Sequence, residues 1–98
     1  HARHEMAFTY EGEIRLGKTI FKEKFEPIDK NCKCLTCKNY TKAYIHYLIK
    51  INELSWKRLI TLHNIYFINN LLKEAGIAIK ENRFNNFKQE FLKNYKIR

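Results

Sequence analysis

The chain of 98 residues carries 19 Lys and Arg against 10 Asp and Glu, which gives a formal net charge of +9 at pH 7. This length fits one small domain, and hydrophobic residues make up 45% of it, which is enough for a core. No apolar run reaches the roughly 20 residues that a membrane helix needs, so we expect no membrane partner.

The positive charge is unevenly distributed along the chain. Residues 1–29 hold five Lys and Arg against six acidic residues, whereas residues 30–98 hold fourteen against four. Such an excess favours a polyanion as partner, and nucleic acid is the one it fits best. The alternative is a generally biased composition, since ten residues are Asn and solvated lysine faces are common.

The first part of the chain, residues 6–25, predicts short strands. Apolar and polar residues alternate on both sides of a turn marked by Glu11-Gly12. The alternating apolar positions are Phe8, Tyr10, Ile14 and Leu16. The segment from Ile20 to Phe25 predicts another short strand. Pro27-Ile28-Asp29 then closes the region, because the residue before a proline resists the helical conformation.

A cluster of thiols follows, and it is the strongest chemical signal of the chain. Cys32, Cys34 and Cys37 are all the cysteines present, and their odd number argues against a framework of disulfides. Thiolates are soft ligands, and zinc takes four nitrogen or sulfur ligands in a tetrahedron. The spacing therefore predicts one structural Zn²⁺ with no open position for catalysis. Free thiols suit a reducing compartment, so we expect the protein in the cytoplasm.

The fourth ligand of this site remains open on chemistry alone. His63 lies on a predicted helix that could fold back over the cysteine loop, and it is the favoured candidate. His46 lies nine residues after Cys37 and is the alternative. His1 and His4 lie in the N-terminal stretch and are weak candidates.

From Lys38 onward the hydrophobic period is helical. One face of the first helix carries Tyr40, Tyr44, Tyr47, Ile51 and Leu54. A break at Asn52–Ser55 follows, and Ser55 is predicted to cap the second helix. The second helix carries Leu59, Leu62, Tyr66, Ile68, Leu71, Leu72 and Ala75, with Gly76 as either its cap or an interior residue. A last helix fits Phe84, Phe87, Phe91, Leu92 and Tyr95.

These elements predict an α+β fold that is mostly α, with short N-terminal strands, a zinc loop and about three helices. We divide it into a strand region at 1–29, a zinc-binding part at 30–64 and C-terminal helices at 65–98. The chain holds no glycine-rich phosphate loop, no HExxH sequence and no nucleophile elbow. We interpret the carboxylates of Glu5, Glu11 and Glu13 as surface charges of strands or turns, so we assign no catalytic residue.

A set of short motifs carries a resemblance to a known family. In chain order they are Ala2-Arg3-His4, Ala7-Phe8-Thr9, Pro27-Ile28-Asp29, the cysteine cluster, Ala43-Tyr44-Ile45-His46, Leu62-His63-Asn64 and Arg83-Phe84. Together they resemble the C-terminal end of the bacterial tRNA-guanine transglycosylases, or queuine tRNA-ribosyltransferases, over essentially the whole chain. Two departures are Glu5 in place of the family's glycine and His1 in place of its asparagine.

The resemblance implies the end of a (β/α)8 TIM barrel with an inserted zinc subdomain. Family members exchange guanine at the tRNA wobble position for a 7-deazaguanine in queuosine biosynthesis, and their catalytic aspartates precede the part matched here. We therefore expect a fragment that is inactive on its own. The four zinc ligands match Cys32, Cys34, Cys37 and His63, which favours His63 over His46.

The resemblance also implies partners. Arg3 matches an arginine that contacts tRNA near the exchanged base, in the anticodon region. Tyr40, Tyr44 and Tyr47 match an aromatic stretch at the family's homodimer interface, with core packing as the alternative. Charge adds three candidate RNA-binding residues near the zinc loop, namely Lys33, Lys38 and Lys42. The rival hypothesis is a free-standing zinc-stabilised nucleic-acid-binding module without catalysis.

Overall fold

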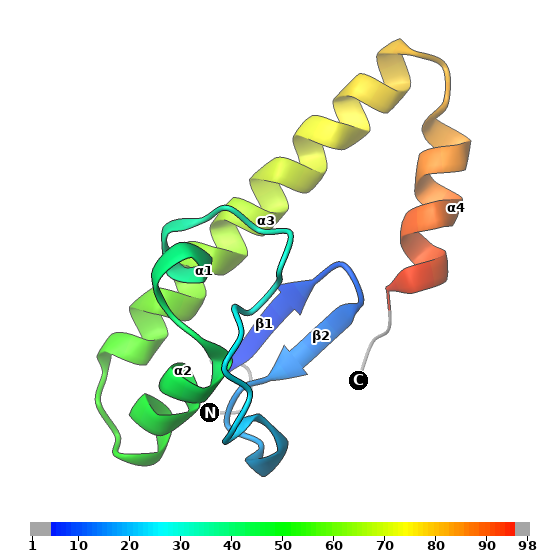
Figure 1. The fold of residues 1–98 in the computed structure, drawn as a ribbon. Coiled ribbons are helices and arrows are strands. Elements are labelled where there is room, and N and C mark those ends of the chain that lie inside the picture. Colours follow the sequence, from blue (N-terminus) through cyan, green and yellow to red (C-terminus); the bar gives the residue numbers. More distant parts are fainter. Residues whose placement is uncertain (1–4, 96–98) are drawn as a thin grey trace.

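The computed structural model describes residues 5–95 of the chain. It is a mostly helical structure with one two-stranded sheet, as Figure 1 shows. The strands are β1 (Met6–Thr9) and β2 (Gly12–Arg15), and a short 3₁₀ turn covers Thr19–Phe21. The helices are α1 (Leu35–Asn39), α2 (Lys42–Lys50), α3 (Ser55–Lys80) and α4 (Phe84–Asn94). The predicted α+β class, mostly α, is therefore confirmed.

The two strands form an antiparallel hairpin, which confirms the predicted turn at Glu11-Gly12. Met6 pairs with Arg15, and Thr9 pairs with Gly12. Gly12 has a φ of 129°, a backbone conformation that side chains with a Cβ rarely adopt, so the turn requires glycine. The Thr9 hydroxyl closes the turn by donating a hydrogen bond to the Gly12 carbonyl at 2.7 Å.

The strand predicted from Ile20 to Phe25 is wrong. This segment begins within the 3₁₀ turn, where the Phe21 N–H donates to the Lys18 carbonyl at 3.0 Å, and its Lys24 carbonyl accepts from the Ala43 N–H of α2 at 3.0 Å. A strand needs a neighbouring strand to bond its peptide groups. Because β2 pairs only with β1, the segment has no such partner among the described residues.

The helix expected from Lys38 onward is divided in two. Helix α1 ends at Asn39, and α2 begins at Lys42 after Thr41, whose hydroxyl caps it by accepting from the Tyr44 N–H at 3.0 Å. The break expected at Asn52–Ser55 is confirmed, with Asn52 in the left-handed region at φ 60°. The capping role predicted for Ser55 is wrong, because the Glu53 carboxylate accepts from the Ser55 N–H instead.

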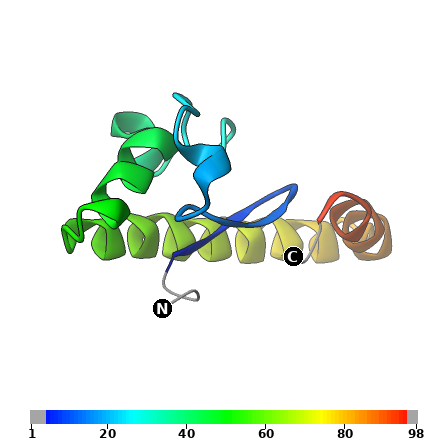
Figure 2. The same cartoon turned by 90° about the horizontal axis from the view of Figure 1, so that it is seen from below.

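Helix α3 is a 26-residue rod on which the rest of the molecule is assembled, as Figures 1 and 2 show. Gly76 is an interior residue of this helix, and Asn82 at φ 56° provides the left-handed turn after it. The hairpin, α1 and α2 pack on one side of α3, and α4 folds back beside its C-terminal end. No helix in residues 5–95 is long and apolar enough to cross a membrane.

The core lies between the first half of α3, the hairpin, α1 and α2. The face of α3 that enters it differs from the apolar set noted in the sequence. The buried residues of α3 are Trp56, Ile60, His63, Phe67 and Ala78. Of these, Trp56 and Ile60 form one hydrophobic cluster with Ala7, Leu16, Ile28, Cys34, Cys37, Ile45 and Leu48. Two of the three thiols are therefore part of the hydrophobic core, which places the predicted metal site at the centre of the fold.

Tyr10, at the tip of the hairpin, contacts both α3 and α4. Its hydroxyl donates to the Glu74 carboxylate at 2.9 Å and accepts from the Asn70 amide at 3.1 Å. Its ring lies 4.7 Å from that of Phe67 and meets the ring of Phe91 edge-on at 6.3 Å. Burial and the neighbouring Glu74 carboxylate raise the pKa of Tyr10 to about 12. The phenol is thus neutral and donating at physiological pH.

Candidate metal centre

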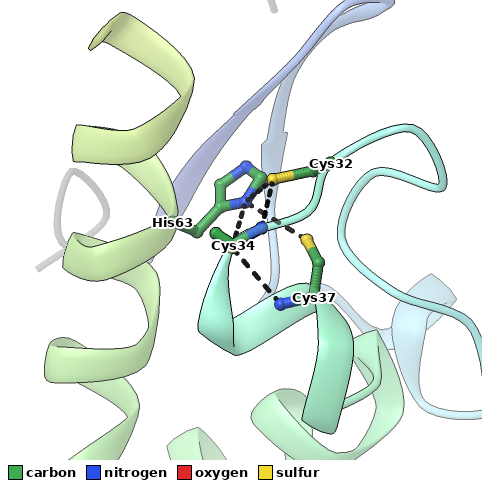
Figure 3. Close-up of side chains that lie close together, drawn as sticks. All are labelled: Cys32, Cys34, Cys37 and His63. Carbon is green, nitrogen blue, oxygen red and sulfur yellow. Dashed lines mark hydrogen bonds between the residues drawn. The ribbon is translucent and has the colours of Figure 1, made fainter. Parts of the chain in front are cut away.

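The cysteine loop bends so that its own peptide groups point at the sulfur atoms (Figure 3). The Cys34 N–H donates to Cys32 Sγ at 3.5 Å, and the Cys37 N–H donates to Cys34 Sγ at 3.3 Å. The second bond makes Cys34 the N-cap of α1. Amide donors aimed at sulfur favour the thiolate form, which is the form that binds metals.

His63 reaches the loop from the third turn of α3. Its Nδ1 atom lies 3.5 Å from the Sγ atoms of Cys32 and Cys34 and 3.3 Å from that of Cys37. The ring is fully buried, and its Nε2 atom donates to the Phe8 carbonyl at 2.6 Å. The proton is therefore on Nε2, and the free electron pair of Nδ1 faces the three sulfur atoms.

These distances fit a tetrahedral ion. Zinc bonds of about 2.3 Å to sulfur and 2.0–2.1 Å to nitrogen place a sulfur and a nitrogen ligand about 3.5 Å apart. The four donor atoms all lie within 4.8 Å of one another. The residues therefore are positioned to hold one metal ion. With all four positions taken by protein atoms, no site remains for a reacting water, so the arrangement suits a structural role.

Burial favours the neutral forms of the thiols and of the imidazole, so thiolates in this cluster need a cation beside them. Burial raises the pKa of the thiols of Cys32 and Cys37, and it lowers the pKa of His63. The neutral imidazole that results is the form that ligates a metal. A dication at the centre offsets the cost of burying thiolates, because the opposite charge stabilises them directly.

His46, the alternative ligand, lies elsewhere. Its Nδ1 atom donates to the Leu16 carbonyl at 2.8 Å, and the side chain is buried in the core. The structure thus brings together the four residues favoured in the sequence and excludes His46 from the cluster. His1 and His4 lie outside the described residues.

Three supporting residues were not recognised from the sequence. Thr36 is fully buried and donates to the Leu59 carbonyl at 2.7 Å, which fastens α1 to α3. The Asp29 carboxylate accepts from the N–H groups of Tyr10 and Asn31, which ties the hairpin to the start of the cysteine loop. Asn64 bonds β1 on the side that faces α3. The only sequence signal for Asp29 and Asn64 was their membership of the motifs Pro27-Ile28-Asp29 and Leu62-His63-Asn64, which assigned them no role.

The candidate RNA-binding lysines differ in their surroundings. Lys33 and Lys38 are exposed, on the cysteine loop and on α1. Lys42 is partly buried, and its ammonium lies 3.4 Å from the Glu26 carboxylate. Because the chain breaks between α1 and α2, Lys38 and Lys42 lie on different helices. Arg3 lies outside the described residues.

The three tyrosines lie on the outer side of α1 and α2, outside the core that the described residues form. Tyr44 and Tyr47 are exposed by 44% and 56%, and the rings of Tyr40 and Tyr44 stack at 5.5 Å. The opposite side of α2 enters the core through Ala43, Ile45, His46 and Leu48.

Three thiols, two of them buried, and a buried imidazole on a small, mostly helical frame form a candidate metal centre of the Cys3His type. The family model for queuine tRNA-ribosyltransferase matches residues 1–97. The chain is 46% identical over 96 residues to the queuine tRNA-ribosyltransferase of Francisella tularensis subsp. novicida, which covers 98% of this chain and 26% of that protein.

Two further relatives with the same description give the same result. The chain is 45% identical to that of Fusobacterium nucleatum over 94 residues, which is 96% of this chain and 25% of the relative. It is 46% identical to that of Helicobacter pylori over all 98 residues, 26% of the relative. The chain belongs to the queuine tRNA-ribosyltransferase family, as the motifs indicated. It spans about a quarter of the length of these curated relatives.

Proposed function

We propose that the chain is the zinc-binding C-terminal portion of a tRNA-guanine transglycosylase, which exchanges guanine at the tRNA wobble position for a 7-deazaguanine. The family match over residues 1–97 is the observation that carries this proposal. The proposed cofactor is one structural Zn²⁺ held by Cys32, Cys34, Cys37 and His63. The expected setting is the reducing cytoplasm, which preserves the thiols.

The surface of α3 supports a place within a larger protein. Large apolar side chains of this helix are exposed, among them Ile65, Ile68, Leu72 and Ile79. We infer that the remainder of the enzyme, a (β/α)8 barrel in the family, covers part of this surface. The barrel would also supply the catalytic aspartates and the pocket for the base.

The coding DNA upstream of residue 1 discriminates this proposal from a free-standing nucleic-acid-binding module. We expect an in-frame barrel whose nucleophilic aspartate lies a few residues before Ala2-Arg3-His4. A start codon at the beginning of this chain, with no barrel before it, would instead favour the free-standing module.

We further propose that the basic surface around the metal centre docks tRNA. Lys33 and Lys38 are exposed beside the cysteines, and Arg3 is the residue for which the resemblance implies contact near the exchanged base. Each phosphate contact that a lysine makes releases counterions, so binding weakens with salt in proportion to the number of contacts. Lys42 contributes less, because the Glu26 carboxylate already neutralises much of its charge.

Replacing Lys33 or Lys38 with alanine should therefore flatten the salt dependence of tRNA binding. We expect the slope of log K against log salt to fall by about 0.7–0.9 for each lost contact. Filter binding between 50 and 200 mM salt, about the range in which such slopes are read, measures it. Lys93→Ala, an exposed lysine on α4 at the other end of the molecule, is the matched control. Unchanged slopes for both loop variants would refute this placement of the tRNA.

The tyrosine face of α1 and α2, which consists of Tyr40, Tyr44 and Tyr47, is proposed to bind a second copy of the chain. Aromatic side chains are enriched in protein interfaces, and here three of them are exposed side by side. Tyr44→Asp should shift the protein from dimer to monomer in sedimentation velocity, since it buries a charge in the interface. Tyr66→Asp, at an exposed tyrosine of α3, should leave the dimer intact. A dimer that tolerates Tyr44→Asp would contradict the proposal.

A further inference from the structure

One edge of strand β1 is bonded by side chains. The other edge pairs with β2 in the hairpin. On the edge that faces α3, the Phe8 N–H donates to Asn64 Oδ1 at 3.0 Å, and the Met6 carbonyl accepts from Asn64 Nδ2 at 3.0 Å. Next to these two bonds along the same edge, the Phe8 carbonyl accepts from His63 Nε2 at 2.6 Å. Two neighbouring residues of one helix thus take the place of a third strand.

The same imidazole therefore faces the strand and the thiol cluster. Nδ1 of His63 lies 3.3–3.5 Å from the three sulfur atoms, and Nε2 donates a hydrogen bond to the Phe8 carbonyl. A metal at Nδ1 requires the electron pair of that nitrogen, which places the ring proton on Nε2. The tautomer that binds the metal is hence the one that bonds β1. A carbonyl in this position also fixes the rotation of the ring toward the ion.

We propose that Asn64 is a positioning residue for the metal centre. By holding the peptide groups of Met6 and Phe8, it sets where the Phe8 carbonyl lies, and this carbonyl orients His63. Metal binding and docking of the hairpin Met6–Arg15 against α3 are consequently coupled, and each strengthens the other by the same factor. The inference depends on the metal centre and is independent of tRNA and of catalysis.

Because α3 holds the hairpin at two places, positioning of His63 can be distinguished from general docking of the hairpin. Asn64 holds β1 beside the metal ligand, whereas the hydroxyl of Tyr10 holds the tip of the same hairpin through Glu74 and Asn70 of α3. A change at Tyr10 weakens hairpin docking without touching the bonds around Phe8. If the role of Asn64 were only to hold the hairpin, changes at both residues would affect the metal equally.

The experiment measures the affinity of the full chain for Zn²⁺ alone, by competition with a chromophoric chelator. We expect Asn64→Ala to weaken zinc binding about 10- to 100-fold, the range for residues that orient a metal ligand. Asn69→Ala makes the same change of helix propensity at an exposed position of α3 and should stay within about twofold of the unchanged chain. Tyr10→Phe should likewise stay within about threefold.

A second variant and a spectroscopic measurement complete the test. Asn64→Asp keeps the acceptor for the Phe8 N–H and loses the donor to Met6, so it should also weaken zinc binding. This variant provides the test if Asn64→Ala does not fold. In the zinc-saturated protein, NMR should show the Nε2–H proton of His63 exchanging faster with solvent in Asn64→Ala, while the amide of Phe67, within α3, is unchanged.

Three outcomes would overturn the inference. Zinc affinity of both Asn64 variants equal to that of Asn69→Ala, with an unchanged Nε2–H signal, would remove the positioning role. Equal losses in Asn64→Ala and Tyr10→Phe would reduce it to general docking of the hairpin. An unchanged chain that binds no zinc would overturn the metal centre itself and the coupling with it.

Discussion

Replacing Cys34 with serine should unfold the cysteine loop and the packing of α1 against α3. Cys34 is buried, caps α1 through its sulfur and lies 3.5 Å from His63 Nδ1. A serine hydroxyl is a poor zinc ligand, and the binding free energy of a structural zinc is on the order of 10 kcal/mol of folding free energy. This loss is as large as the whole stability of a typical small domain.

Elemental analysis and thermal melting by circular dichroism measure this effect. We expect about one zinc per chain in the native protein and little or none in Cys34→Ser, because four ligands bind cooperatively with folding. Leu35→Ser introduces the same residue at the next, exposed position of the chain and should retain the metal. A Cys34→Ser variant with full zinc content and an unchanged melting temperature would rule out the site.

Of the two buried histidines, only His63 should be needed for metal binding. His63→Ala removes a donor that faces all three thiols, so we expect the zinc to be lost to a competing chelator. His46→Ala removes only the hydrogen bond to the Leu16 carbonyl. It should lower the free energy of unfolding by about 1–3 kcal/mol, the cost of leaving a buried polar group unpaired, and retain one zinc per chain.

Chelator competition and denaturant unfolding of zinc-loaded protein separate the two variants. The assignment of ligands requires that zinc affinity falls steeply in His63→Ala and that only stability changes in His46→Ala. Loss of zinc in His46→Ala together with its retention in His63→Ala would show that the cluster is arranged differently in solution.

Much of the local structure could be predicted because its causes lie close together in the chain. The turn of the hairpin needs a residue that adopts a positive φ without steric cost, and Gly12 marks this position between two alternating segments. Helices were recognised from their 3.6-residue period, and α4 in particular lies where the aromatic residues recur. The three thiols lie within six positions, so their spacing alone placed them in one loop.

Errors arose where longer-range packing decided the local conformation. The tyrosine period suggested one continuous helix, yet Thr41 caps a new helix and turns the chain so that the other side of α2 enters the core. The apolar residues noted on the second helix similarly lie on more than one face of α3. Hydrophobic residues on α3 outnumber the positions that one core can bury, so composition did not reveal which face packs inward.

The sequence by itself determined the donor chemistry, the hairpin turn and the helical character of this protein. Each of these depends on residue type and on spacing within a few positions. Only the tertiary structure decided which histidine joins the thiols, because His63 and His46 both lie on helices and differ in what their rings face. It also revealed Asn64, whose role arises from hydrogen bonds to Met6 and Phe8, more than fifty residues away. Such bonds form only when α3 packs against β1, which no local pattern encodes.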